Sequence, residues 1–358
     1  MHKLGYFSAF LLPLVVLLGH FLGGSFEFLN VAFVFIIIPL LDELVGKDRY
    51  NIPKEEVQAV SDDQFFKWVT YAWVYVQFVL VIWGAWVVST QALSTAEWIG
   101  FTLSIALTTG GIGITVAHEL GHKKSATERF YAKALLMTVC YMHFYIEHNR
   151  GHHVRVATPE DPATARKGES FYAFWLRAVF IGYSHAWQLE NERMKRNGKH
   201  PFSLDNEMIR FTILPIAFAG LLWLTLSLYT GSNAWQALPF FFVQSFFAFT
   251  LLELVDYIEH YGIVRKPTAD GRYERVNPLH SWNANHLVSN FFLFQLQRHS
   301  DHHAHAIKRY QVLDHLDESP QLPFGYPTMI LMALIPPLWF TLMDKKLENW
   351  KTASLSAG

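Results

Sequence analysis

Cysteine is almost absent from this sequence: its 358 residues include only Cys140. A single thiol excludes an intramolecular disulfide, an iron–sulfur cluster and a four-cysteine iron site made by this chain alone. Charged residues are also scarce, at 16% compared with about 25% in soluble domains. The formal net charge of −1 gives no indication of a nucleic-acid partner, and we expect none.

The sequence contains several long runs of apolar residues, which are typical of membrane helices. We predict six spans, at about 5–22, 27–43, 68–90, 98–117, 210–230 and 234–256. The three short turns near residues 24, 95 and 232 contain no Lys or Arg, so the positive-inside rule places both termini in the cytoplasm. The predicted fold class is all-α: one domain over 1–358, a six-helix membrane bundle with a cytoplasmic helical cap.

Histidine is abundant, with 18 residues, and three groups of them have helical spacing. The groups are His118 and His122; His148, His152 and His153; and His299, His302 and His303. A lone histidine is more often a core residue, but three groups with ligand spacing favour metal binding. Eight imidazoles exceed what one tetrahedral ion uses, so we predict a two-metal site on the cytoplasmic side.

The sixth span adds a ninth predicted ligand. Glu253, Asp256 and His260 follow steps of three and four residues, so they share one helix face. A carboxylate at membrane depth normally faces a partner in the bundle, and we expect these two acids to hold imidazole rings through the N–H that does not bind metal.

Other polar residues accompany the groups, with two interpretations open. The set is Glu119, Glu147, Glu259, Asp301, His280 and His286. The four acids either orient ligand rings or balance local cations. The two histidines are either ligands themselves, although they lack helical partners, or they support the ligands or serve structure. Asp161 is expected only to cap its loop.

Two further sets are predicted around the metals. Gly111 and Thr115 lie on one helical stripe with His118, which indicates either close helix packing or a groove leading to the metals. Trp68, Trp73 and Trp83 either set the depth of such a substrate channel or pack in the core.

The basic residues Arg150, Arg155, Arg298, Lys308 and Arg309 either reflect topology alone or form a docking surface for an acidic electron donor.

Two apolar segments are not counted as spans. If 130–146 crossed the membrane, His118 and His148 would lie on opposite sides, so we expect a helix in or beneath the membrane boundary. The segment 325–343 contains Pro336 and Pro337 and is expected to be amphipathic or re-entrant.

The longer motifs resemble a known family. They are HELGHKK (118–124), EHNRGHH (147–153), TPEDPA (158–163), DYIEHYG (256–262) and LQRHSDHH (296–303). Their spacing is similar to that of the membrane-bound di-iron desaturases and hydroxylases, and the strings themselves resemble the bacterial alkane 1-monooxygenases. The likeness extends from the first span to about Tyr310. One departure is Asp256, where the family motif is expected to begin with Asn.

The resemblance implies two iron ions held by the nine histidines named above, in a bacterial inner membrane. It implies hydroxylation of the terminal methyl of medium-chain n-alkanes to 1-alkanols, with O2 and with electrons from rubredoxin and an upstream reductase. The tail 352–358 is consistent with the start of a linker to a fused rubredoxin.

Three other functions have weaker support in the sequence. A desaturase or another hydroxylase of the same superfamily would use the same metals. His118-Glu119 with His122 also satisfies the HExxH pattern of zinc proteases, but the remaining histidines have no use there. A metal transporter would need charged residues along its spans, and the first five spans have almost none.

Overall fold

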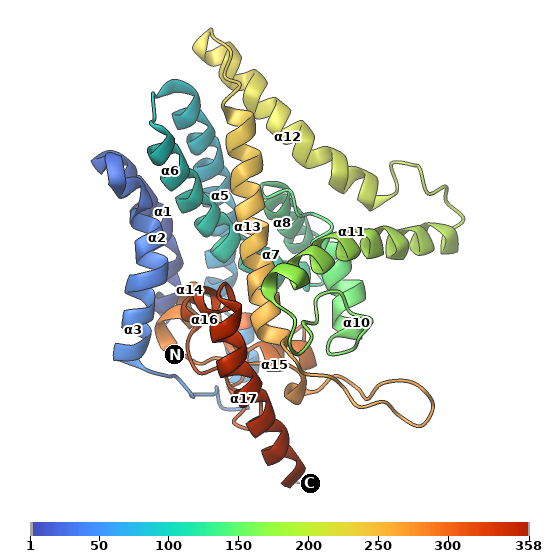
Figure 1. Ribbon diagram of the computed structural model, residues 1–358. Coiled ribbons are helices and arrows are strands. Elements are labelled where there is room, and N and C mark those ends of the chain that lie inside the picture. The colour runs from blue at the N-terminus through green and yellow to red at the C-terminus, as the bar shows by residue number, and fades with distance from the viewer. Residues whose placement is uncertain (1–2, 357–358) are drawn as a thin grey trace.

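The computed structural model describes residues 3–356, and in that part of the chain all regular structure is helical apart from isolated β-bridges (Figure 1). Six helices are long and apolar enough to cross a membrane: Lys3–Leu22, Gly24–Val45, Val57–Thr90, Thr95–Gly121, Glu207–Thr230 and Ala237–His260. The predicted all-α fold with six spans is confirmed, and the chain is a multi-pass membrane protein.

Four of the spans are assembled from consecutive elements. The first is η1 (Lys3–Phe10) with α1 (Leu11–Leu22), and the second is η2 (Gly24–Phe28), α2 (Leu29–Ala32), η3 (Phe33–Ile37) and α3 (Ile38–Val45). The third is α4 (Val57–Asp62) with α5 (Gln64–Thr90), and the fourth is α6 (Thr95–Thr108), η4 (Thr109–Ile114) and α7 (Thr115–Gly121). The fifth and sixth are α12 (Glu207–Thr230) and α13 (Ala237–His260).

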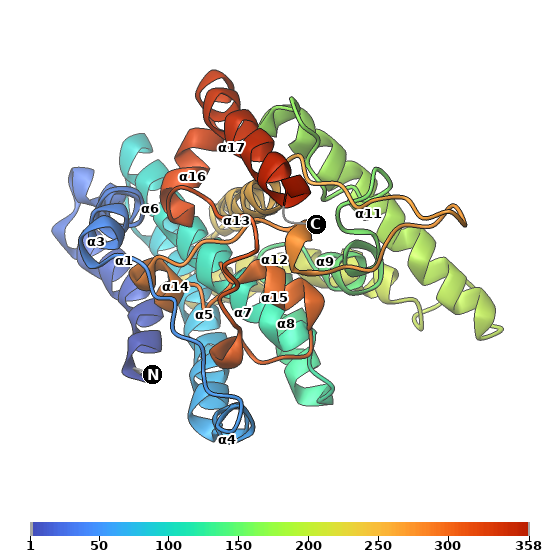
Figure 2. The same cartoon turned by 90° about the horizontal axis from the view of Figure 1, so that it is seen from below.

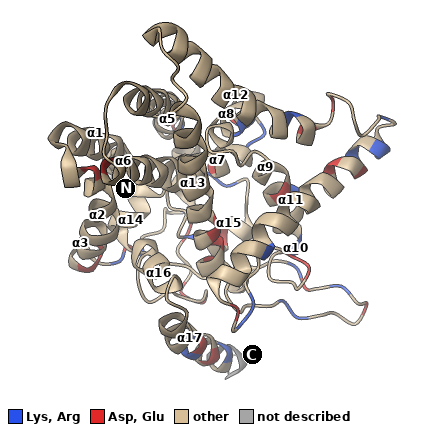
Figure 3. Cartoon of the chain, turned by 45° about the horizontal axis from the view of Figure 1, so that its top comes forward, with Lys and Arg blue, Asp and Glu red and all other residues tan. Residues whose placement is uncertain are grey.

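The remaining elements lie between and after the spans. They are α8 (Ala126–Met137), α9 (Phe144–Ile146), η5 (Glu147–His152), α10 (His153–Arg155), α11 (Phe171–Arg196), η6 (Pro278–His280), α14 (Leu287–Phe292), α15 (His299–Ala304), η7 (Tyr310–Val312), α16 (Tyr326–Ala333) and α17 (Pro336–Ser356). Most of them gather at the lower end of the bundle in Figure 1, seen from below in Figure 2, where the described chain also begins and ends. Figure 3 shows Lys, Arg, Asp and Glu gathered on α11, α17 and the connecting loops.

The helix α13 is the central element of the bundle. It packs against α5, α6, η4, α11, α12 and α16. Its approach to the fourth span depends on Gly110, because a Cβ placed there would lie 2.6 Å from the carbonyl oxygen of Ala248. No side chain fits at that distance, so the glycine sets how closely α13 and η4 approach.

The segment 126–155 differs from the prediction of a helix along the membrane boundary. It does not cross, but α8 and α9 form a pair that turns inside the bundle beside α5 and α13. The side chain of Gln77 donates to Thr138 Oγ1 (2.7 Å), and that of Gln244 donates to the Thr138 carbonyl (2.8 Å). Gln244 precedes His260 by 16 residues on α13, which is about 24 Å at 1.5 Å per residue. The turn at Thr138 can lie at this depth because the buried amide side chains of Gln77 and Gln244 form hydrogen bonds with its polar atoms.

The segment 325–343 forms two helices, and neither is among the six candidate spans. The chain breaks at residues 334–335 because Pro336 and Pro337 begin a new helix, α17. The first helix, α16, packs against α13 and η3. The predicted tail 352–358 continues α17 as far as residue 356, and residues 357–358 lie outside the described part.

The close approach at η4 gives a stability prediction. We expect Gly110→Ala to lower the free energy of unfolding by about 1–3 kcal/mol, because the methyl group collides with backbone. The control is Gly111→Ala, whose new Cβ would meet only Leu251 Cδ2, at 3.6 Å. Thermal unfolding of both variants in detergent tests this; equal melting temperatures would contradict the packing described here.

Candidate metal centre

Four segments bring the nine histidines together at the lower end of the bundle. Their ring nitrogens form two groups, within each of which one nitrogen per residue lies within 4.8 Å of all the others. The first group is His118, His122, His148, His153 and His302, and the second is His152, His260, His299 and His303. The two groups together contain the nine residues singled out in the sequence and no other histidine.

The assignment within the groups differs from simple helical spacing. His148 and His152 were expected to share one face at i,i+4, but they belong to different groups. The reason is that residues 147–152 form a π-helix, whose i→i+5 repeat brings His153 beside His148 instead. The two Nε2 atoms of that pair are 3.0 Å apart. His302 is likewise separated from His299 and His303.

The contacts between imidazoles fit bound cations. In the second group, His299 Nε2 lies 2.8 Å from His303 Nε2 and 3.2 Å from His260 Nε2. Two nitrogens bound at about 2.1 Å and at right angles on one ion are about 3.0 Å apart. Hydrogen bonds alone do not account for this arrangement, because the buried Nε2 atoms of His118 and His302 have no hydrogen-bond partner. The residues therefore fit a metal centre.

The protonation state of the rings also suits metal binding. Burial, reinforced by neighbouring imidazoles, lowers the pKa of His148, His302 and His303 well below the usual value. At neutral pH these rings are uncharged, and the neutral imidazole is the form that binds metal.

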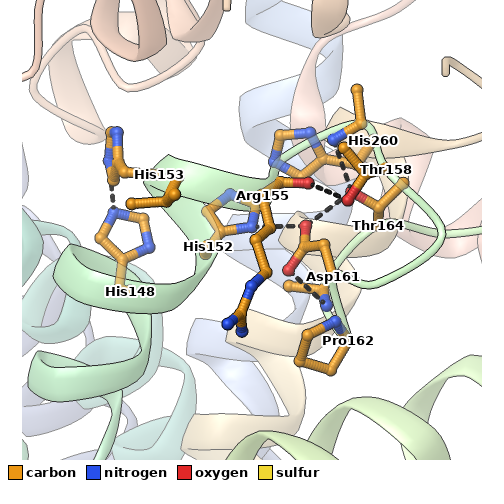
Figure 4. Close-up of polar contacts among 12 residues, drawn as sticks. His148, His152, His153, Arg155, Thr158, Asp161, Pro162, Thr164 and His260 are labelled. Atoms are coloured by element: carbon orange, nitrogen blue, oxygen red, sulfur yellow. Dashed lines mark hydrogen bonds and ion pairs between the residues drawn. The ribbon is translucent and has the colours of Figure 1, made fainter. Parts of the chain in front are cut away.

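One ring is held by a residue whose role the sequence did not reveal. Asp161, expected to cap its loop, lies with Oδ2 2.9 Å from His152 Nδ1 (Figure 4). The same oxygen accepts a hydrogen bond from Thr164 Oγ1 at 2.6 Å. The carboxylate thus fixes the ring so that its Nε2 faces the second group. The signal available in the sequence was an acid in the loop directly after the EHNRGHH motif.

Among the acids expected to orient ligands, Glu259 is the one with a direct contact to a grouped imidazole. Its Oε2 lies 3.1 Å from His299 Nε2, and Tyr326 donates to its Oε1 at 2.5 Å. Asp256 joins Glu259 and His260 in a smaller cluster of possible ligand atoms. A carboxylate therefore borders the second group in addition to its four histidines.

The other expected partners make different contacts. Glu147 bonds His185 Nδ1 on α11 (2.9 Å), and Glu253 accepts from the Tyr141 hydroxyl (2.6 Å). Glu119 pairs with Lys123, and Asp301 pairs with Lys308 and His305. The His280 side chain completes the capping box of η6 and lies beside Glu274. The backbone of His286 forms an antiparallel β-bridge with that of Lys47. His185 and Tyr141 were not singled out, because neither belongs to a motif with ligand spacing.

An apolar cavity reaches the metal groups from within the bundle. Its walls come from α1, η3, α6, η4, α13, α14 and α16, and His118, His148 and His299 are among its lining residues. Gly111 and Thr115 also line it, in agreement with the predicted groove. Because Gly111 has no side chain, this stretch of wall is open.

The three tryptophans do not line this cavity. Trp68 is 64% exposed on the outer face of α5. Trp73 is buried and donates to Gln77, and Trp83 packs against His20 and Phe101. Of the two interpretations left open by the sequence, packing in the core or at the outer surface is the one that agrees with these positions.

The basic residues proposed for donor docking are mostly engaged in pairs. Arg150 contacts Glu190 and Glu207, Lys308 contacts Asp301 and Asp314, Arg309 contacts Glu128, and Arg155 contacts His185. Arg298 is only 4% exposed and donates to the Leu313 carbonyl, so it cannot form part of a docking surface. The metal groups come nearest to solvent at His122 and His153, which are partly exposed.

Comparison with known proteins adds independent information. A family model described as fatty acid desaturase matches residues 96–332. The chain is 42% identical over 333 residues to alkane 1-monooxygenase from Pseudomonas putida, covering 93% of this chain and 81% of that protein. It is 44% identical over 338 residues to alkane 1-monooxygenase 2 from Pseudomonas aeruginosa, covering 93% and 87%. The chain belongs to the alkane 1-monooxygenase family. It is thus an oxidoreductase, as the motifs indicated.

A more distant relative has a different name. The hydroxylase component of xylene/toluene monooxygenase from Pseudomonas putida is 27% identical over 348 residues, covering 95% of this chain and 89% of that protein. The zinc-protease interpretation has no support in these relationships. In addition, Glu119 is engaged by Lys123 Nζ at 2.9 Å and does not stand free as a base.

The grouping of the histidines gives a metal-content prediction. We expect His302→Ala to lose the metal of the first group, because it removes one of five converging nitrogens. His305→Ala is the matched control, since that ring is exposed and belongs to neither group. Metal per protein, measured by inductively coupled plasma mass spectrometry, should fall in the first variant alone. Equal content in both would refute the assignment.

The contact between Asp161 and His152 gives a second prediction. We expect Asp161→Asn to weaken metal binding by about 10–100-fold, because the carboxylate no longer fixes the ring. Competition with a chelator measures the change. The variant Glu160→Gln alters the neighbouring exposed acid and should leave affinity unchanged; an unchanged affinity in Asp161→Asn would show that His152 needs no anchor.

Proposed function

We propose that this protein is a di-iron monooxygenase that hydroxylates the terminal methyl of medium-chain n-alkanes to 1-alkanols. It would use O2 and electrons from rubredoxin, separate or fused, with an upstream reductase. The observation that carries the proposal is an apolar cavity whose end is lined by imidazoles of a nine-histidine centre. We also propose that residues 1–358 form one functional domain.

The nine histidines would hold two iron ions, His118, His122, His148, His153 and His302 one of them and His152, His260, His299 and His303 the other. Bound iron supplies the activation of O2 that an alkane C–H bond requires, a chemistry that protein side chains lack. Around it, Asp161 fixes one ring, and Glu259 with Tyr326 borders the second group.

The walls of the apolar cavity would select the substrate. An alkane has no polar group to recognise, so its binding depends on apolar contact and shape. Leu107, Leu251 and Phe35 supply such contacts, and His118, His148 and His299 line the same cavity. A linear chain lying in this cavity would present one end to the metals.

Electrons must arrive from outside this chain. Its one cysteine, Cys140, is partly buried, and a single thiol cannot form an iron–sulfur or four-cysteine iron site. We propose that rubredoxin approaches where His122 and His153 are partly exposed, with Arg150, Arg155, Lys308 and Arg309 at the margin. This end of the molecule would face the cytoplasm, with both termini, in a bacterial inner membrane.

A second candidate has its own support. The matching family model is described as fatty acid desaturase, and one relative is named for xylene and toluene. A desaturase or another methyl hydroxylase would use the same centre and differ in the product.

Product identification tests the function. We expect membranes containing the protein, given rubredoxin, reductase, NADH and octane, to form 1-octanol. The same membranes receive xylene and an acyl thioester in parallel, with the His302→Ala variant as the inactive control. A benzylic alcohol or an alkene in place of 1-octanol would overturn the proposal in favour of the second candidate.

The cavity makes a further prediction about chain length. We expect Gly111→Leu to shift preference to shorter alkanes, because the new side chain enters the cavity beside Leu251. The loss in kcat/KM for the longest substrate should be at least about tenfold, with short alkanes little affected. Phe130→Leu, on an exposed site of α8, is the control. An unchanged profile would place the substrate elsewhere.

A further inference from the structure

A second, smaller cavity reaches the metal groups from the side covered by α11. Its character differs from that of the apolar cavity, because polar side chains dominate one wall: Tyr141, His143, Glu147, Glu253 and Asp256. The grouped histidines His148 and His152 also line it. We call this space the polar cavity.

Glu253 is the unusual residue of the polar cavity. It lies on α13 inside the sixth span and is 4% exposed. Its Oε1 accepts from the Tyr141 hydroxyl at 2.6 Å, but its buried Oε2 has no hydrogen-bond partner in the protein. A buried carboxylate oxygen without a partner is costly, so water is expected to supply one. The adjoining space is polar and large enough to hold it.

The polar groups form a sequence from the surface inward. His143 packs against Tyr183, which is 36% exposed, with 5.1 Å between ring centroids. Its ring also contacts the ring of Tyr141 at 4.3 Å. Tyr141 then bonds Glu253, and Asp256 follows on the same face of α13, one turn nearer the second group. Asp256 lines both cavities.

The reaction proposed above requires such a path, and the present inference rests on that proposed function. One oxygen atom of O2 enters a C–H bond, giving C–O and O–H bonds. The other oxygen leaves as water after taking up two protons and the two electrons that the external donor supplies. Most residues that line the apolar cavity are apolar, so a continuous chain of water is disfavoured there, and its polar residues Asp256, Glu259 and Tyr326 lie among them.

We propose that the polar cavity holds water and that Glu253 passes protons from this water to the metal centre. Product water leaves by the same space. Glu253 is the residue that binds and releases the proton, and Tyr141 positions it. The two cavities thus have separate functions: alkane enters through the apolar cavity, and protons and water move through the polar cavity.

The first test asks whether water occupies the polar cavity, and it requires no turnover. Tyr141 and Tyr326 are matched probes, because both are nearly fully buried and both donate to a carboxylate, but Tyr326 lines the apolar cavity. Radiolytic hydroxyl-radical footprinting of the zinc-loaded full chain should oxidise Tyr141 several-fold faster than Tyr326. Equal rates would overturn the water-filled cavity.

The second test asks whether Glu253 moves protons. Glu253→Gln should lower kcat for hydroxylation at least about tenfold, with KM for the alkane unchanged, and should increase the solvent deuterium isotope effect. Glu253→Asp should recover part of the rate, and Tyr141→Phe should give a smaller loss of the same kind. Glu27→Gln, a buried acid of another span paired with His20, is the control. Metal content is measured in every variant.

The outcomes separate this inference from the proposed function. If the unaltered protein forms 1-alkanol but Glu253→Gln retains its kcat and isotope effect, the proton path is overturned and the function stands. If the unaltered protein hydroxylates no alkane, the proposed function fails, whereas the footprinting result still decides whether the polar cavity contains water.

Discussion

The convergence of buried imidazoles is the constraint on which the rest of this structure depends. Nine rings from four separated segments must present nitrogens within 4.8 Å of one another in two groups. Each ring is desolvated, and each has neighbours of its own kind, so without a shared cation the arrangement leaves nitrogens such as Nε2 of His118 unsatisfied. This requirement fixes the depth at which α7 and α13 end and the position of η5 and α15.

Helix α13 contributes residues to both cavities beside the metal groups. One face of α13 contributes Leu251, Leu252 and Val255 to the apolar cavity. Glu253 lines only the polar cavity, and Asp256 lines both. A single helix can do this because successive residues point about 100° apart around its axis, so Glu253 faces the polar cavity while Leu251 and Val255, four residues apart, face the apolar one. The sequence Leu-Leu-Glu-Leu-Val-Asp (251–256), which ends four residues before His260, thus places the apolar cavity beside the polar cavity.

The sequence allowed the fold class and the nine grouped histidines to be predicted, because both follow from local patterns. Apolar runs identify spans, and repeated i,i+4 imidazoles identify helical metal motifs. The division of the nine into five and four was not accessible, since it depends on a π-helix at residues 147–152 that spacing alone does not reveal. The anchoring of His152 by Asp161 and the inward turn at Thr138 are likewise tertiary contacts. The sequence left the role of the α5 tryptophans open, because a run of apolar residues does not show which helix face meets the cavity.

The positions of bound iron test the account most directly. Anomalous scattering at the iron edge, from crystals of the iron-loaded protein, locates the metal without reference to activity. The account predicts two iron peaks, one among His118, His122, His148, His153 and His302 and the other among His152, His260, His299 and His303. A single peak, or iron bound outside these two groups, would contradict it.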